Sequence, residues 1–157
     1  MKPTRVTNLL TAFVIVAGVG FFVIRGLVGS GQPTPTIGLN LVLIQPTLAI
    51  ILLLSAIPMI RYRRGLKKFE SNQGKRPVPV DSRYAIRTLA LAKAFSLTGS
   101  ITGGWSLAVL SYQFTSPETS RLAFPILGLL GALLMVAAGL YTENLFRIPP
   151  EKDGDAA

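Results

Sequence analysis

The chain has neither cysteine nor histidine among its 157 residues. Without cysteine it can form no disulfide, no thiolate metal site and no thiol nucleophile. Without histidine it lacks the commonest general base and the commonest metal ligand. Acids are also scarce, with seven Asp and Glu against sixteen Lys and Arg. These absences leave few groups for conventional catalysis, so we expect a protein that is not an enzyme and holds no metal or other cofactor.

Charged residues are few, and hydrophobic residues make up half of the chain. Charged residues make up 15% of the chain, well below the roughly 25% of a typical soluble domain. The apolar residues form four long runs, each near the roughly 20 residues that a helix needs to cross hydrocarbon. The sequence therefore predicts an all-α integral membrane protein with four transmembrane helices in an antiparallel bundle.

One domain, over residues 1–147, should hold these helices, at residues 6–26, 37–60, 83–113 and 119–145. The first run is longer than the apolar region of a signal peptide, which spans about 7–15 residues, so we expect an uncleaved helix. Pro46 and Pro58 should bend the second helix. Residues 61–82 form a basic loop, where Asp81 or Ser82 can cap the third helix. Residues 148–157 form a flexible acidic tail.

Basic residues gather on one side of the expected membrane. Of the sixteen Lys and Arg residues, only Arg25 and Arg121 lie in the two short loops. All others lie at the N-terminus, in or just beyond the basic loop, or at the C-terminus. The positive-inside rule places that side in the cytoplasm. We therefore expect a multi-pass protein of the plasma membrane with both termini cytoplasmic.

The basic loop has two interpretations. Membrane insertion alone selects for such charge. Alternatively the loop contacts anionic lipid or an acidic partner, at about 1 kcal/mol per basic residue near the surface, and the candidates are Arg61, Arg63, Arg64, Lys67 and Lys68. The net charge of +9 could suggest a nucleic-acid partner. The basic residues lie beside apolar runs, and membrane insertion explains their charge without a nucleic-acid partner. We therefore expect no nucleic-acid binding.

Lys93 is unusual because it lies about one turn inside the third apolar run. Its ammonium can reach the headgroups along its own stem. The alternative is an intramembrane ion pair with Glu143, since both residues fall at the cytoplasmic ends of antiparallel neighbouring helices.

The third helix also carries a face of small residues at spacings of three and four: Ser96, Gly99, Ser100, Gly103 and Gly104. In lipid such faces let helix backbones approach closely. The partner could be another helix of the chain, with Gly128 and Gly131 as the matching surface. It could also be a second copy or a different protein. Asn40 and Gln45, in the outer half of the second helix, should hydrogen-bond a neighbour or line a shallow cavity.

These features favour a non-enzymatic accessory or scaffolding subunit of a larger envelope complex. Its partners would be membrane lipids and another membrane protein or a second copy of itself. The alternative is a small oligomeric transporter or a lipid-handling membrane protein. A transporter needs a polar path, and only Asn40, Gln45 and the serines of the third helix suggest one.

Three segments carry a family resemblance: residues 1–5 (MKPTR), residues 87–94 (RTLALAKA) and residues 143–150 (ENLFRIPP). Together they resemble the small actinobacterial membrane proteins grouped as domain of unknown function 3180. The resemblance implies a four-helix plasma-membrane protein. It implies no activity and no mechanism.

Overall fold

A computed structural model of the chain describes residues 5–70, 81–115 and 122–146, and within them no side-chain placement for Lys67, Glu70 and Ser82. All regular structure in these residues is helical, which confirms the all-α prediction. The helices are α1 (Val6–Gly29), α2 (Leu39–Glu70), α3 (Ser82–Thr115) and α4 (Ala123–Phe146).

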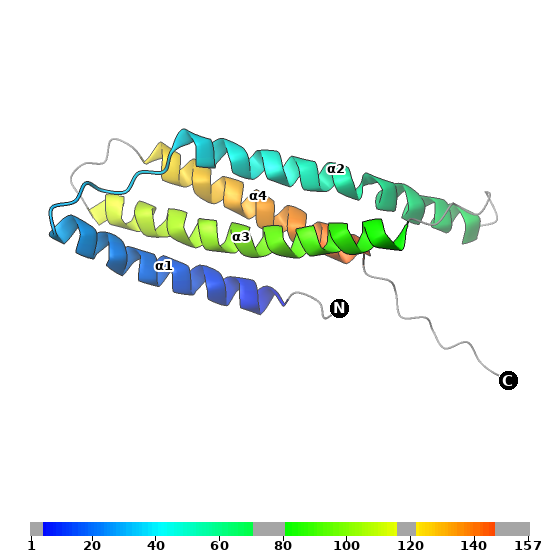
Figure 1. Cartoon of the computed structure of the whole chain (residues 1–157), viewed down its shortest axis with the longest axis horizontal. Coiled ribbons are helices and arrows are strands. Elements are labelled where there is room, and N and C mark those ends of the chain that lie inside the picture. Colours follow the sequence, from blue (N-terminus) through cyan, green and yellow to red (C-terminus); the bar gives the residue numbers. More distant parts are fainter. Residues whose placement is uncertain (1–4, 71–80, 116–121, 147–157) are drawn as a thin grey trace.

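The four helices lie side by side with α3 at the centre (Figure 1). α3 packs on α1 and on α4, and α2 packs mainly on the other side of α4. Within the described residues the backbone of α1 comes close to that of α3 alone. The lateral order is therefore α1, α3, α4, α2, and the consecutive helices α1 and α2 are not neighbours in it. The bundle is open, and α1 and α4 lie on two sides of the same central helix.

The end of α2 corrects one expected boundary. α2 was expected to end at residue 60, but it continues to Glu70, so residues 61–70 of the expected loop are helical. Arg, Lys, Leu and Glu dominate this stretch, and all four are strong helix formers. Residues 71–80 and the expected tail at 148–157 lie outside the described residues.

α3 begins where the sequence predicts a cap. The Asp81 Oδ1 atom accepts a hydrogen bond from the Arg83 backbone N–H at 3.1 Å. This bond satisfies one of the free donors at the helix start. Of the two predicted capping residues, the structure shows Asp81 in that role.

Pro46 and Pro58 both lie inside α2, as expected. Proline removes a backbone donor and disturbs the carbonyls one turn before it. In the turn before Pro58, the Ser55 carbonyl oxygen accepts a hydrogen bond from the Tyr84 hydroxyl at 2.6 Å. Tyr84 belongs to α3, so this bond links the basic ends of α2 and α3.

Three of the described helices are long and apolar enough to cross a membrane: α1, the Leu39–Leu66 part of α2, and α4. α3 does not meet that measure, because Ser, Thr and Gly replace many large apolar residues along it. Its position explains the difference. A helix covered by neighbours on two sides needs little apolar surface of its own.

The hydroxyl groups of α3 are largely satisfied within the helix itself. Ser96 donates to the Lys93 carbonyl at 2.9 Å, Ser100 to the Ser96 carbonyl at 3.0 Å, and Ser106 to the Thr102 carbonyl at 2.9 Å. Side chains bonded to the preceding turn present little free polarity to their neighbours. α3 can therefore be rich in serine and still pack inside an apolar bundle.

Close packing of α3 on α1 gives a stability prediction. A Cβ at Gly104 would lie 2.6 Å from the Phe13 backbone oxygen, whereas a Cβ at Gly18 would meet nothing within 4 Å. Gly104→Ala should therefore lower the free energy of unfolding by about 1–3 kcal/mol. Gly18→Ala is the control and should be neutral or stabilising by up to about 1 kcal/mol. Thermal unfolding of both variants in mild detergent measures the difference, and equal midpoints would contradict the close contact.

Candidate functional site

The predicted small-residue face is an interface between helices of this chain. Ser96, Gly99, Ser100, Gly103 and Gly104 are all buried. A Cβ at Gly99 would lie 2.9 Å from the Val136 Cγ2 atom and 3.0 Å from the Ala132 backbone oxygen, both on α4. Gly104 faces the other way, toward α1. Because glycine has no side chain, both α1 and α4 can approach the backbone of α3 at these positions.

The matching surface on α4 agrees with the prediction only in part. Gly128 meets Ser106 of α3 and Ile37, and Gly131 meets Gln45 and Pro46 of α2. Gly131 therefore serves the contact with α2 and not the small-residue face of α3.

Gly139 belongs to the matching surface and was missed. A Cβ there would lie 2.7 Å from the Ala92 backbone oxygen and 2.9 Å from the Ser96 Cβ atom of α3. Ala132 and Gly139 are seven residues apart, which is two turns of one helix face. That spacing was the available signal in the sequence.

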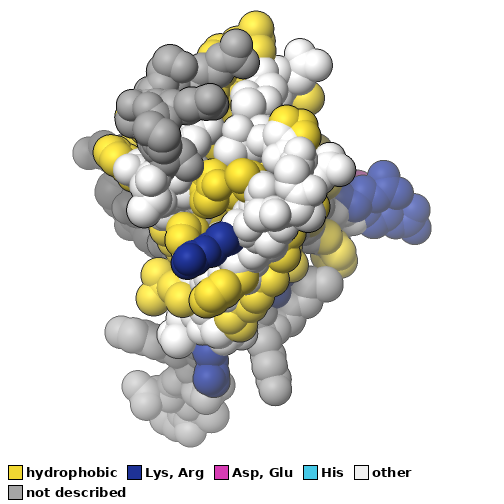
Figure 2. Space-filling view, turned by 90° about the vertical axis from the view of Figure 1, so that its left-hand side faces the viewer, with side chains coloured by type: hydrophobic (Ala, Val, Ile, Leu, Met, Phe, Trp, Pro, Cys, Tyr) yellow, Lys and Arg dark blue, Asp and Glu magenta, His cyan; other side chains and the backbone are white. Residues whose placement is uncertain are grey.

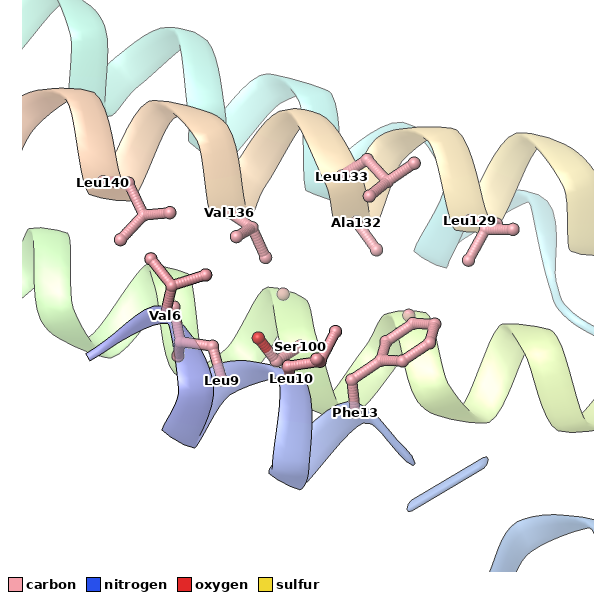
Figure 3. Close-up of a pocket in the computed structure, with 12 residues that line it drawn as sticks. Val6, Leu9, Leu10, Phe13, Ser100, Leu129, Ala132, Leu133, Val136 and Leu140 are labelled. Atoms are coloured by element: carbon pink, nitrogen blue, oxygen red, sulfur yellow. The ribbon is translucent and has the colours of Figure 1, made fainter. Parts of the chain in front are cut away.

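A groove opens where α1 and α4 diverge over α3 (Figure 3). Its volume is about 170 Å³. Side chains of α1 and α4 face each other across it, and the small-residue face of α3 forms the floor, with Gly99, Ser100 and Gly103. The walls are entirely apolar, with Leu10 and Phe13 on one side and Leu133 and Leu140 on the other. No sequence pattern indicated this groove, because its walls come from helices that are not neighbours along the chain.

Gln45 is buried against α4 at 2% exposure. Its Oε1 atom lies 2.7 Å from where a Cβ at Gly131 would be. Neither Oε1 nor Nε2 has a hydrogen-bond partner, which contradicts the expected bond to a neighbouring helix. A buried amide without a partner costs roughly 1–3 kcal/mol. Asn40, the other polar residue expected to act with Gln45, is exposed.

Lys93 and Glu143 lie at the same level of the bundle. A Cβ at Gly139 would lie 2.7 Å from the Ala92 backbone oxygen, and Glu143 follows Gly139 by one turn, so antiparallel packing brings it level with this part of α3. Glu143 is 5% exposed, and Lys93 is partly buried. The register is compatible with the predicted ion pair, which stays a prediction.

The basic residues of the α2 extension divide between helix faces. Arg61, Arg64 and Lys68 are exposed and lie at spacings of three and four, so they share one face. Arg63 is partly buried, and the side chain of Lys67 lies outside the described residues. The predicted contact of this segment with anionic lipid stays a prediction.

Comparison with known families gave one match. The model of the family described as "Protein of unknown function (DUF3180)" matches residues 9–150. Searches of curated proteins and of solved structures gave no match to the chain. The family resemblance is thereby confirmed, while an actinobacterial source stays a prediction.

The ion pair can be tested by charge exchange. We expect Lys93→Glu and Glu143→Lys each to lower the unfolding midpoint, because each places two like charges at one level of the bundle. The double variant restores opposite charges and should recover most of the loss. Thermal unfolding in mild detergent measures all three. Losses in the double variant equal to the sum of the single losses would show that the residues do not interact.

Proposed function

Since the chain belongs to the DUF3180 family across residues 9–150, and that family has no known function, we propose a function from the arrangement of its helices. The protein is an integral protein of the plasma membrane with four spans and both termini in the cytoplasm. It acts as a non-enzymatic accessory subunit that binds another membrane protein of the envelope.

Helix lengths support α3 as the fourth span. α3 has 34 residues, which gives about 51 Å at 1.5 Å per residue, against about 30 Å of hydrocarbon. It runs between α1 and α4, two of the helices that are apolar enough to cross a membrane. A central helix flanked in this way must cross wherever its neighbours cross.

The distribution of charge supports the orientation. At the end formed by the start of α1, the end of α2 and the start of α3, the basic residues are Arg5, Arg61, Arg63, Arg64, Lys68, Arg83, Arg87 and Lys93. At the opposite end Arg25 is the basic residue among those described. Figure 2 views that opposite end and shows mostly apolar and uncharged side chains on it. The basic end is the one that the positive-inside rule assigns to the cytoplasm.

Labelling of introduced cysteines tests this topology without further mutation, because the chain has no cysteine of its own. Ser30→Cys and Arg64→Cys place a thiol at exposed positions near opposite ends of the bundle. In intact cells a membrane-impermeant maleimide should label Ser30→Cys. It should label Arg64→Cys only after the cells are permeabilised. The reverse pattern would invert the topology, and labelling of both in intact cells would refute it.

The observation that carries the accessory role is the uncovered face of α1. Among the described residues the backbone of α1 lies close to α3 alone, and the opposite face of α1 exposes large apolar side chains, including Val14 at 59% and Phe22 at 72%. The small-residue face is already used within the chain. A partner helix would therefore have to dock on another surface, and the uncovered face of α1, a helix at the edge of the bundle, is the one that we propose for it.

Affinity purification of the tagged protein in mild detergent tests the accessory role. Wild type should retain one defined membrane protein in fixed ratio, and Val14→Trp should reduce its recovery about tenfold by placing bulk on the docking face. Leu54→Trp is the matched control on α2, because Leu54 is 57% exposed and far from α1. Recovery of wild type alone at monomer mass would contradict an accessory role.

A second candidate function, lipid handling, is favoured by the apolar groove between α1 and α4. Binding of a lipid chain in this groove requires neither a catalytic group nor a polar path through the bundle.

A further inference from the structure

We propose that the groove between α1 and α4 binds one acyl chain of an anionic glycerophospholipid, whose headgroup lies near Arg5. This site would add a structural lipid to the protein. It does not depend on the accessory role.

The lining of the groove determines the chemistry of the bound segment. Ser100 supplies the one hydroxyl group among the side chains that line it, and that hydroxyl donates to the Ser96 carbonyl at 3.0 Å. The remaining lining side chains are Val, Leu, Phe and Ala, together with glycine backbone. A ligand inside the groove finds no free donor, so the inserted part must be hydrocarbon.

The shape of the groove favours a thin chain. It follows the helices from Leu129 to Leu140 on α4, which is about 17 Å at 1.5 Å per residue. Gly99, Ser100 and Gly103 line its floor, and side chains of α1 and α4 flank them on both sides. A helix with its side chains is about 10–12 Å wide and could only cover the opening. Phe13 and Val136 lie over the glycines of the floor, so an unbranched methylene chain would lie along these side chains, between the walls of α1 and α4.

The medium supplies such chains. Three of the described helices are apolar enough to lie in a bilayer, where acyl chains run roughly parallel to them. The side chains on the walls of an empty apolar groove lack dispersion contacts on one side, and an acyl chain that fills the groove restores them. Each buried methylene contributes about 0.8 kcal/mol relative to water, but a chain that moves from bulk lipid gains only the difference in packing. The headgroup must therefore add to the preference for this site.

Arg5 supplies the charge at one end of the groove. Val6 lines the groove, and Arg5 precedes it as the exposed N-cap of α1. α1 and α3 run parallel, with a Cβ at Gly103 lying 3.2 Å from Phe13. This register brings Arg5 level with the part of α3 that contains Lys93. A phosphate at the basic membrane surface can thus meet a guanidinium while its acyl chain enters the groove, and an Arg–phosphate contact is strong and geometrically specific.

Native mass spectrometry of the purified full chain tests the site. The protein is reconstituted in a mixture of phosphatidylcholine and phosphatidylglycerol, re-extracted in mild detergent and washed. Wild type should retain one phosphatidylglycerol per chain. Leu10→Trp and Leu133→Trp, which fill the groove from opposite walls, should each lower the retained fraction about tenfold.

Two neighbouring positions give matched controls. Val14 on α1 and Leu134 on α4 are as exposed as Leu10 and Leu133, at 59% and 57%, but neither lines the groove. Val14→Trp and Leu134→Trp should retain the lipid. Because Val14→Trp is expected to lose the protein partner and keep the lipid, failure of one proposal is distinguishable from failure of the other.

The headgroup is tested by charge removal. Arg5→Gln should reduce the preference for phosphatidylglycerol over phosphatidylcholine about tenfold, and Arg25→Gln, at the other end of α1, should not. Absence of retained lipid on wild type, or equal retention in the groove and control variants, would overturn the site. A dimer mass that only the groove variants abolish would also overturn it, by showing that a second copy occupies the groove. Equal retention of both lipids would overturn the role of Arg5.

Discussion

Close approach of three helix backbones at α3 is the constraint on which the rest of the structure depends. Gly99 and Gly139 bring α3 and α4 together, and Gly104 brings α3 against α1. In lipid there is little hydrophobic drive between helices, so van der Waals contact over such small residues carries the association. Side chains at these positions would push α1 and α4 outward and remove the floor on which the groove rests.

The sequence predicted the elements better than their contacts. Long apolar runs identify α1, α2 and α4 almost without ambiguity, and Asp81 marks the start of α3. The end of α2 was missed because a charged stretch reads as a loop when charge is the only signal, although its Arg, Lys and Leu residues also favour helix.

The sequence predicted less reliably which faces of the helices pack against each other. Small residues on α4 at 128, 131, 132 and 139 lie on more than one face, and spacing alone does not say which face meets α3. Gly131 packs on α2, whereas Ala132 and Gly139 pack on α3. The groove was beyond prediction for a related reason. The groove depends on the relative position of α1 and α4, which are distant in sequence and are held apart by α3 between them.

Polar groups in the bundle fall into two kinds. The serines of α3 bond to their own backbone and present little polarity to the surroundings. Gln45 and the Thr142 hydroxyl are buried without a hydrogen-bond partner, and in a medium of low dielectric each such group is costly. The stability of the bundle is therefore a balance between tight glycine contacts and a few unsatisfied polar groups.

The weak hydropathy of α3 has a consequence for biogenesis. Segments enter the bilayer from the ribosome in chain order, and the insertion machinery recognises each largely by its own apolar character. α1, α2 and α4 carry that signal themselves, but α3 does not. Its apolar cover comes from α1, made earlier, and from α4, made last. In the four-span arrangement the entry of α3 into the membrane would depend on its contacts with α1 and α4, and so on more than its own sequence.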